Sequence, residues 1–574
     1  MLDLLIRGGA VVDGTGAPRR VADLGVRAGR IAVIGEADEP AVRTVDASGL
    51  VVAPGFVDIH THYDAQLFWD PTASPSPLHG VTTVFGGNCG FSLAPLRRHD
   101  DYVMRMMAKV EGIPLAALEQ GLPWDWTSFP EWLHRIERPF AVNAGFLCGH
   151  SALRRAVMGE DAVGGTASPR HVDEMVRLLH DALAAGAMGF STSTAPPHND
   201  GAGRPVPSRA AEPEEVLALA AALHDHPGTT LELIFAGCLN EFSPGEVDLM
   251  ASMSLLANRP VNWNILGVSA QSKARCEQQL HASTVAAARG ARVVALTLPR
   301  TNGMRMTFLS GAPLDGLPGW REVIALPVSE RARALADPDV RRRLAAGAAS
   351  DEAGALRYVA NWPALSIVET FASSNRQYEG RTVADVASER GQDPFDALLD
   401  VVLVDDLRTG LRPPAPADSA EGWEYQTEVW RDPRTMIGGS DAGAHLDMMC
   451  GAVYSTSLLA SVRAHGGMSV EEAVQLLSDA PARFYGVRER GRLVEGWHAD
   501  LVLFDPDTVA FGTECTRLDL PGGAPRLYTE STGVEHVFTN GTQVVADGVL
   551  TGATPGGLLR SGRDTESVTV PGGA

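Results

Sequence analysis

Lysine is almost absent from this sequence of 574 residues, which has Lys109 and Lys273 and otherwise takes its positive charge from arginine. Basic residues number 48 against 70 acidic ones, so the net charge is −22. A chain this acidic repels phosphate backbones and anionic lipid surfaces. We therefore expect neither nucleic acid nor a membrane as partner. A small-molecule substrate remains open, because a local pocket can oppose the overall sign.

Closely spaced cysteines are also missing. The six cysteines of the chain are Cys89, Cys148, Cys238, Cys276, Cys450 and Cys515. Without a C-x-x-C pair, they fit a reducing compartment better than a disulfide framework. No apolar run approaches the roughly 18 residues needed to cross a bilayer, and the charged Asp3 and Arg7 are unlike a signal peptide. We expect a cytoplasmic protein, with homo-oligomer formation left open.

Short apolar runs broken by turns fill the first 50 residues and return after about residue 488. This texture is typical of β-strands. We therefore expect residues 1–52 and 488–560 to meet in one small β-domain. Between them, short buried runs alternate with amphipathic helices such as 170–185, 212–224 and 277–289. That alternation indicates βα units around a parallel sheet.

Eight buried runs are the candidate strands of the central region, 53–487. They are 51–60, 81–86, 140–147, 187–192, 229–235, 260–266, 292–298 and 435–440. Eight strands with helical crossovers predict the α/β class and a (β/α)₈ barrel. The interval 299–434 is too long for one crossover, so we expect an insertion over the barrel mouth. The last residues, 561–574, have little apolar content and are expected to be a flexible tail.

His60-Thr61-His62 ends the first candidate strand. Side chains at i and i+2 of a strand point to the same face, and the active site of a barrel lies at the carboxyl ends of its strands. The two imidazoles are therefore placed to bind one metal ion. The alternative is a pair of polar residues that only closes the strand.

Two other strand ends carry side chains of the metal-binding type. Asp441 could ligate a metal and take a proton from water, although an aspartate after a strand is also a common helix N-cap. Cys89 would be a soft ligand as a thiolate, or else a small buried side chain. The segment Gly438-Gly-Ser440-Asp-Ala442 superficially matches a serine-hydrolase elbow, but it ends on alanine where glycine is required.

Four motifs occur together along the chain. They are Pro54-Gly-Phe-Val-Asp-Ile-His-Thr-His-Tyr-Asp-Ala65, His79-Gly-Val-Thr-Thr-Val-Phe-Gly-Gly-Asn-Cys-Gly-Phe91, Gly149-His-Ser-Ala-Leu-Arg154 and Gly438-Gly-Ser-Asp441. Together they resemble the D-aminoacylase (N-acyl-D-amino-acid deacylase) branch of the amidohydrolase superfamily. The segment Gly491–Asp505 is similar to the closing segment of amidohydrolases generally.

The resemblance implies a (β/α)₈ barrel with a β-sandwich built from both termini. It also implies a zinc-activated water that attacks an amide carbonyl. By motif, His60 and His62 take metal-binding roles, Cys89 takes the role of a bridging cysteine, and Asp441 matches the catalytic aspartate. Many superfamily members use a carboxylated lysine as the bridge at strand four. Residues 186–193 contain no lysine, which agrees with a cysteine bridge.

The sequence departs from the family at strands five and six. The family normally has a histidine at the end of each, and here 229–235 and 261–266 contain none. Glu232 and Asn264 are the nearest polar residues. A carboxylate in a barrel strand is costly unless it is paired or metal-bound, so Glu232 is a candidate ligand or catalytic group. Asn264 suits a substrate hydrogen bond. The pattern favours one Zn²⁺ and leaves a second open.

Candidate substrate-binding residues follow strands three, four and eight. They are His150, Arg154, His198, Arg204, Arg209 and His445. An arginine can pair bidentately with a substrate carboxylate. His198 could also substitute for a missing ligand, and His445 could steer the leaving group. Each of the six could equally be an ordinary loop or helix-start residue.

These features predict a metal-dependent hydrolase of a linear amide such as an N-acyl-D-amino acid. Asp441 would act first as general base and then as general acid. One alternative is a hydrolase with a mononuclear site that acts on a cyclic amide or on an intermediate of specialised metabolism. Another is a barrel that binds a metal or a ligand without turnover.

Overall fold

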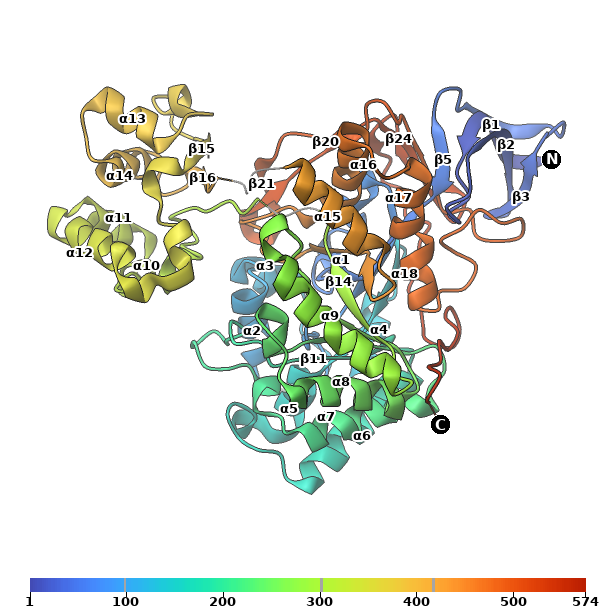
Figure 1. Cartoon of the computed structure of the whole chain (residues 1–574), viewed down its shortest axis with the longest axis horizontal. Coiled ribbons are helices and arrows are strands. Elements are labelled where there is room, and N and C mark those ends of the chain that lie inside the picture. Colours follow the sequence, from blue (N-terminus) through green and yellow to red (C-terminus); the bar gives the residue numbers. More distant parts are fainter. Residues whose placement is uncertain (98–99, 300–302, 415–418, 574) are drawn as a thin grey trace.

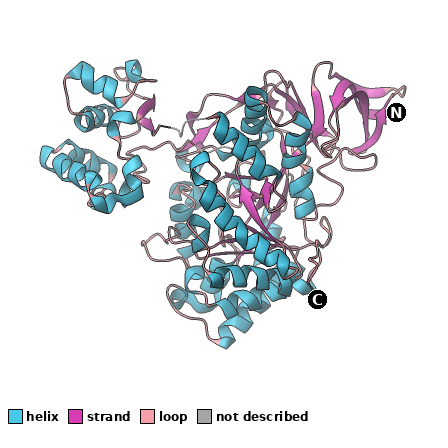
Figure 2. Cartoon of the chain, in the orientation of Figure 1, coloured by secondary structure: helices cyan, strands magenta, loops and turns pink. Residues whose placement is uncertain are grey.

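The computed structural model describes residues 1–97, 100–299, 303–414 and 419–573. Three regions are visible in Figure 1: a central body, a sheet at one side that carries the N-terminus, and a helical lobe that stands away from the body. Figure 2 shows that strands lie inside the body and that helices surround them. Within the described ranges, every helix is too short or too polar to cross a membrane.

Strands from both chain ends form one nine-stranded sheet. The N-terminal strands are β1 (Leu2–Val11), β2 (Arg20–Arg27), β3 (Arg30–Gly35), β4 (Ala41–Asp46) and β5 (Val51–Pro54). The C-terminal strands are β19 (Leu501–Phe504), β24 (Val534–Thr539), β25 (Thr542–Ala546) and β26 (Val549–Leu550). β5 pairs parallel with β1 and antiparallel with β19, so it joins the two ends of the chain.

Eight strand segments of the body run parallel. In chain order they are β6 (Phe56–Asp58) with β7 (His60–Thr61), β8 (Val81–Gly86), β9 (Asn143–Phe146) with β10 (Cys148–Gly149), β11 (Gly189–Ser193), β12 (Thr230–Ile234), β13 (Val261–Trp263), β14 (Val293–Thr297), and β17 (Thr435–Ile437) with β18 (Gly439–Ala442). Each pairs with its neighbour in the chain, and β18 also pairs with β7. The last segment therefore lies beside the first.

Helices connect these strands and cover them. Those between β10 and β14 are α5 (His150–Met158), α6 (Pro169–Ala184), α7 (Pro213–Ala221), α8 (Pro244–Ala257) and α9 (Lys273–Ala288). Consecutive members of this series contact one another. Ser168 and Ser243 cap α6 and α8, each followed by proline at the first helical position. These local signals fix where each helix begins after its loop.

The other helices of the body flank the first and last strand segments. They are α1 (Gln66–Trp69), α2 (Tyr102–Val110), α3 (Leu115–Gly121), α4 (Phe129–Ile136), α15 (Ala420–Arg431), α16 (Tyr454–His465), α17 (Val470–Leu477) and α18 (Asp479–Phe484). Short strand pairs complete the C-terminal part: β20 (Ala510–Phe511) with β23 (Ser531–Thr532), and β21 (Cys515–Leu520) with β22 (Ala524–Tyr528).

The lobe has a hydrophobic core of its own. It contains α10 (Arg321–Ile324), α11 (Val328–Ala336), α12 (Pro338–Ala349), α13 (Val383–Arg390), α14 (Pro394–Val404), and β15 (Ser366–Glu369) paired with β16 (Gly410–Arg412). Trp362 and Phe395 stack at its centre, with ring centroids 5.0 Å apart. The expected insertion, 299–434, also includes α15, which packs on β17 of the body. The separate lobe is therefore shorter than that range and ends near β16.

The C-terminal segment, expected to be a flexible tail over 561–574, lies instead along the amino-terminal side of the parallel strands. Thr565 Oγ1 donates to the carbonyl oxygen of Gly228 at 2.6 Å, and the Val570 N–H donates to Asn258 Oδ1 at 3.1 Å. Gly228 lies two residues before β12, and Asn258 lies three residues before β13. A side chain and a backbone N–H of this segment thus have protein partners, in place of the flexible tail that was expected.

Candidate active site

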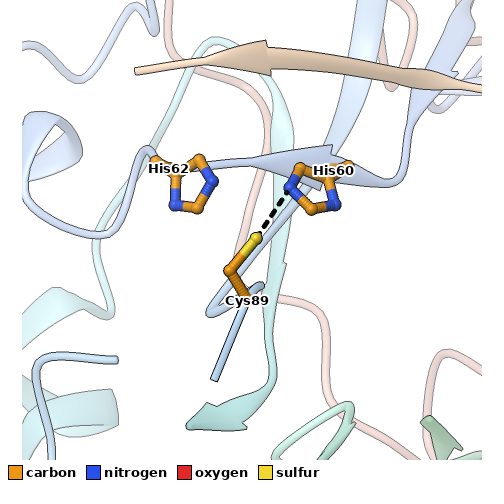
Figure 3. Close-up of side chains that lie close together, drawn as sticks. All are labelled: His60, His62 and Cys89. Carbon is orange, nitrogen blue, oxygen red and sulfur yellow. Dashed lines mark hydrogen bonds between the residues drawn. The ribbon is translucent and has the colours of Figure 1, made fainter. Parts of the chain in front are cut away.

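His60, His62 and Cys89 lie together in the body (Figure 3). His60 belongs to β7 and Cys89 follows β8. Cys89 Sγ is 3.5 Å from His60 Nε2, and one donor atom from each of the three residues lies within 4.8 Å of the others. All three side chains are buried. The structure thus brings together three residues that the sequence singled out as metal ligands.

Asp441 lies in β18, beside the two imidazoles. Its Oδ1 is 3.1 Å from His62 Nε2 and 3.7 Å from His60 Nε2. The pairing of β18 with β7 places Gly439 opposite His60, which is why residues far apart in the chain meet here. A carboxylate and two imidazoles therefore converge at the ends of adjoining strands.

Three residues of this site have left-handed backbone conformations. The φ angles are +58° at Cys89, +61° at Asp441 and +48° at His445. Residues other than glycine rarely adopt this region, because the Cβ atom crowds the backbone. Such conformations persist only where the surrounding structure imposes them, and they concentrate at functional sites.

The charges around His62 favour a positive group. Glu111 Oε2 lies 3.3 Å from His62 Nδ1, on the side away from Asp441. Burial alone would lower the pKa of His62, but Glu111 and Asp441 raise it to about 10. Burial and the His62 charge lower the pKa of His60 to about 3. The local field therefore stabilises a cation, which can be a protonated imidazole or a metal ion.

Asp441 is a carboxylate in this environment. Burial alone would raise its pKa, but the adjoining His62 imidazole, with His445 and His60, holds the pKa of Asp441 below its usual range. An ionised carboxylate beside two histidines can ligate a metal or accept a proton. Both roles need the charged form that these neighbours favour.

Glu232 and Asn264 are the polar residues nearest the positions where the family resemblance predicts histidines. Glu232 is fully buried in β12; its Oε2 accepts a hydrogen bond from the Cys89 N–H at 2.7 Å, and its Oε1 accepts one from the Asn264 side-chain amide. Burial raises the pKa of Glu232 to about 8, against these two donors. Among the described residues, the clustered donor atoms belong to His60, His62 and Cys89. Glu232 accepts hydrogen bonds from the Cys89 loop and from Asn264, and its role as a metal ligand stays a prediction.

The donor set fits a divalent transition metal. Imidazole nitrogen, carboxylate oxygen and thiolate sulfur are the usual ligands of zinc. Burial raises the pKa of the Cys89 thiol well above its ordinary value, so this thiol would ionise only beside a cation. A coordinated metal deprotonates a thiol directly. The chemistry of His60, His62, Cys89 and Asp441 is therefore consistent with one bound metal ion.

His198 and His445 lie close to this centre. His198 Nδ1 is 2.7 Å from Ser193 Oγ, and its ring packs against Phe91 with centroids 5.1 Å apart. Burial, together with the charges of His445 and His62, lowers the pKa of His198 to about 3. The backbone N–H of His445 donates to the Glu111 carbonyl oxygen at 2.5 Å. The low pKa of His198 favours its neutral imidazole near the metal-binding residues.

His150 and Arg154 have buried partners within the protein, so their predicted role in substrate binding gains no support from these contacts. His150 Nε2 lies 2.8 Å from Glu215 Oε1, and its Nδ1 lies 2.8 Å from Thr192 Oγ1. Arg154 donates to the other oxygen of Glu215. All three charged or polar partners are buried. A buried arginine requires such a counter-charge, and Glu215 on α7 supplies it.

Arg204 and Arg209 stabilise their own loop. Arg204 Nε and Nη2 lie 3.2 and 3.1 Å from Asp200 Oδ2. Arg209 Nη1 donates to the His198 carbonyl oxygen at 3.3 Å and to Asn199 Oδ1 at 2.9 Å. These contacts do not support a role for either arginine as the substrate anchor. They position the loop that carries His198.

Sequence reasoning missed three buried carboxylates. Asp58 Oδ1 accepts from the Ser440 N–H at 3.1 Å and so links the first and last strand segments. Asp64 Oδ2 accepts from the Gly87 N–H at 3.1 Å. Both flank the His60–His62 pair in the sequence, and that position was the available signal. Glu111, which directly follows α2, had no comparable signal.

Comparisons with known proteins extend over nearly the whole chain. The amidohydrolase family model matches residues 43–545. The N-acyl-D-aspartate deacylase of Alcaligenes xylosoxydans xylosoxydans is 31% identical over 568 residues, which cover 98% of this chain and 95% of that protein.

Two solved structures show the same likeness. A D-aminoacylase with a binuclear metal centre, described as having one-metal activation and second-metal attenuation, is 26% identical with a TM-score of 0.64. An N-acyl-D-glutamate deacylase from Bordetella bronchiseptica, bound to zinc and to a phosphonate that mimics the tetrahedral intermediate, is 27% identical with a TM-score of 0.63. Each match covers 98% of this chain and 100% of the other.

The family match includes every residue of the centre, from His60 to Asp441. The relatives cover the β-domain, the body and the lobe alike, so the likeness is not confined to one motif. The α/β fold with a small additional domain, predicted from the sequence, agrees with these structures. The chain belongs to the amidohydrolase family and is a hydrolase of carbon–nitrogen bonds other than peptide bonds.

Proposed function

We propose that this protein hydrolyses the amide bond of an N-acyl-D-amino acid or a similar N-acylated small molecule. The names of the relatives support this substrate class: they are deacylases of N-acyl-D-aspartate and N-acyl-D-glutamate, and a D-aminoacylase. We also propose that the parallel strands form one (β/α)₈ barrel, with the β-domain of both termini beside it. The pairing of β18 with β7 supports closure of the ring.

One zinc ion held by His60, His62 and Asp441, with Cys89 adjoining, is the metal arrangement that we propose. A zinc ion at this position would lower the pKa of a water molecule and polarise the substrate carbonyl. Glu232 accepts hydrogen bonds from Cys89 and Asn264, which supports the proposal that the position of a second metal ion is taken by hydrogen-bonded side chains. Zinc is favoured over hard cations because the donor set includes imidazole and thiol.

Asp441 is the residue that moves the proton in this proposal. Its carboxylate accepts a proton from the attacking water and later passes it to the leaving nitrogen. One carboxylate can serve both steps, because the proton that it takes is the one that it returns. The observation that carries the proposal is the position of Asp441 Oδ1, 3.1 Å from His62 Nε2 and 3.7 Å from His60 Nε2.

The remaining groups of the centre would orient the substrate. Asn264 and Ser193 carry polar side chains next to the cluster, and His198 and His445 offer imidazoles at its edge. We propose that Asn264, His198 and His445 hold the substrate by hydrogen bonds. Precise placement of the amide lowers the activation free energy substantially, because the reacting atoms are then already aligned when the reaction begins.

Metal analysis of the purified protein, combined with hydrolysis assays on N-acetyl-D- and N-acetyl-L-amino acids, tests this function. We expect bound zinc, cleavage in the D series, and loss of cleavage in Asp441→Asn. Absence of metal, or unchanged turnover in that variant, would overturn the catalytic proposal and favour a barrel that only binds.

A second candidate function is hydrolysis of a cyclic amide or of a specialised-metabolite intermediate at a mononuclear site. The observation that favours it is the Glu232–Asn264 pair in place of two histidines. Bound zinc without cleavage of any simple N-acyl amino acid would support this candidate over the first. A panel of hydantoins and dihydropyrimidines would then be the next substrates to assay.

A further inference from the structure

We propose that Glu111 is a positioning residue that holds the imidazole of His62 from the side opposite the metal. His62 lies between two carboxylates: Asp441 Oδ1 is 3.1 Å from Nε2, and Glu111 Oε2 is 3.3 Å from Nδ1. If Nε2 binds the metal, Nδ1 carries the ring proton and lies at ion-pair distance from Glu111 Oε2, although the two groups are not aligned as a hydrogen bond in this structure. This inference rests on the proposed metal at His60 and His62.

Burial makes the contact between Glu111 and His62 specific. The side chains of Glu111 and His62 are 4% and 1% exposed, so bulk water does not compete for either. Among the described residues, no lysine or arginine forms an ion pair with Glu111. A buried carboxylate without a counter-charge is strongly destabilising. The imidazole of His62 is the nearest partner of this carboxylate, and His445 is the other imidazole that acts on it.

The main chain of Glu111 is also held, by two hydrogen bonds. Its N–H closes α2 by donating to the Met107 carbonyl oxygen at 3.0 Å, and its carbonyl oxygen accepts from the His445 N–H at 2.5 Å. Gly112 follows with φ +59°, and a Cβ there would lie 3.1 Å from His445 Cα. The end of α2 thus packs directly on the loop that follows Asp441.

Glu111 consequently connects the two parts of the site. Its side chain contacts His62 from the first strand segment, and its main chain contacts the loop from the last one. A carboxylate behind a metal-binding histidine fixes the tautomer and orientation of the ring and raises its basicity; loss of such a partner typically costs about 10- to 100-fold in metal affinity or activity. A residue that merely fills space would change stability alone.

Three variants separate these roles. Glu111→Gln keeps the size and removes the charge, Glu111→Asp keeps the charge and shortens the side chain, and Glu215→Gln is the matched control. Glu215 is also a buried glutamate beside a buried histidine, His150 at 2.8 Å, but it lies outside the metal-binding cluster. Zinc affinity is measured by competition with a chelator, ligand geometry by the visible spectrum of the cobalt-substituted protein, and stability by Tm.

We expect zinc to bind about 10- to 100-fold more weakly in Glu111→Gln, with an altered cobalt spectrum and with Glu111→Asp in between. Glu215→Gln should lower Tm and leave zinc affinity per folded chain unchanged. Wild-type zinc affinity and an unaltered cobalt spectrum in folded Glu111→Gln would overturn the inference.

If Glu111→Gln does not fold, Glu111→Asp decides in its place: weaker zinc binding supports the inference, and unchanged binding overturns it. A wild-type protein that binds no zinc at all is a different outcome. It would overturn the proposed function itself, and is recognised before any variant is made.

Discussion

The two sides of the centre, one around His62 and the other around Glu232, differ in how completely their polar groups are hydrogen-bonded within the protein. On the His62 side, one imidazole lies between two carboxylates, and the pKa of His62 rises to about 10 because the surroundings favour a positive charge. On the Glu232 side, the Cys89 N–H and the Asn264 amide already donate to the carboxylate. The two carboxylates beside His62 favour a bound cation, whereas the Glu232 carboxylate is already paired with N–H donors. This difference is the reason for proposing one metal ion.

Removal of either imidazole should have the largest effect, because it breaks the cation-binding side itself. In His60→Ala and His62→Ala we expect loss of bound zinc and a fall of kcat/KM to background, beyond the roughly 10- to 100-fold cost of losing an outer partner. Metal analysis and steady-state kinetics check this. His180→Ala is the control, since His180 contacts His226 at 2.9 Å outside the metal-binding cluster. Full zinc occupancy in both ligand variants would contradict the assignment.

Asp441→Asn should rank next. The amide cannot accept the water proton, so we expect kcat to fall by about 10²- to 10⁴-fold. Kinetics at increasing zinc concentration separate the two roles of Asp441. Recovery of kcat at high zinc would show that Asp441 acts only as a ligand.

Glu232→Gln should have a smaller effect on metal binding. Glu232 accepts from two N–H donors, and the amide oxygen of glutamine can still accept from one of them. We expect the free energy of unfolding to fall by about 1–3 kcal/mol while zinc affinity changes less than about tenfold, below the loss typical of outer partners. Chemical denaturation and zinc titration measure the two quantities. Loss of zinc binding here would make Glu232 a ligand and erase the contrast between the two sides.

Arg204→Ala should have the smallest effect. The Arg204 side chain is 56% exposed and pairs with Asp200, and such surface pairs contribute about 0–1 kcal/mol. We expect KM for N-acetyl-D-amino acids to stay within about twofold, whereas Asn264→Ala should raise it, because a lost hydrogen bond costs about 1 kcal/mol. A large rise in KM for Arg204→Ala would restore it as the substrate anchor.

Much of the fold could be predicted because its signals are local. The run 229–235 is apolar enough to be a buried strand, and β12 (Thr230–Ile234) lies within it. The same holds for the predicted helix 170–185 and α6 (Pro169–Ala184), which has its serine cap and its proline in the sequence. Periodicity and capping are read over a few neighbouring residues.

The candidate site was predictable only where its geometry is equally local. His60 and His62 share a strand end, so their spacing already implies proximity. Glu111 reaches His62 only because the end of α2 packs on the loop at His445. The partner of Arg154 could not be predicted for the same reason: Glu215 is 61 residues further along the chain. The sequence can identify a polar residue at a strand end as a candidate site residue. The residue that it contacts is known only from the tertiary structure.

The position of β5 between β1 and β19 constrains how the chain is made. During synthesis, β1–β5 leave the ribosome first, but the strand that covers the outer edge of β5 is encoded at residues 501–504. Until then Val51 and Val52 present an unpaired, apolar edge, the kind of surface that recruits other strands. A strand near the start of this sequence is therefore completed only by one near its end. We expect the unpaired edge to be a site of aggregation for a chain that has not yet reached residues 501–504.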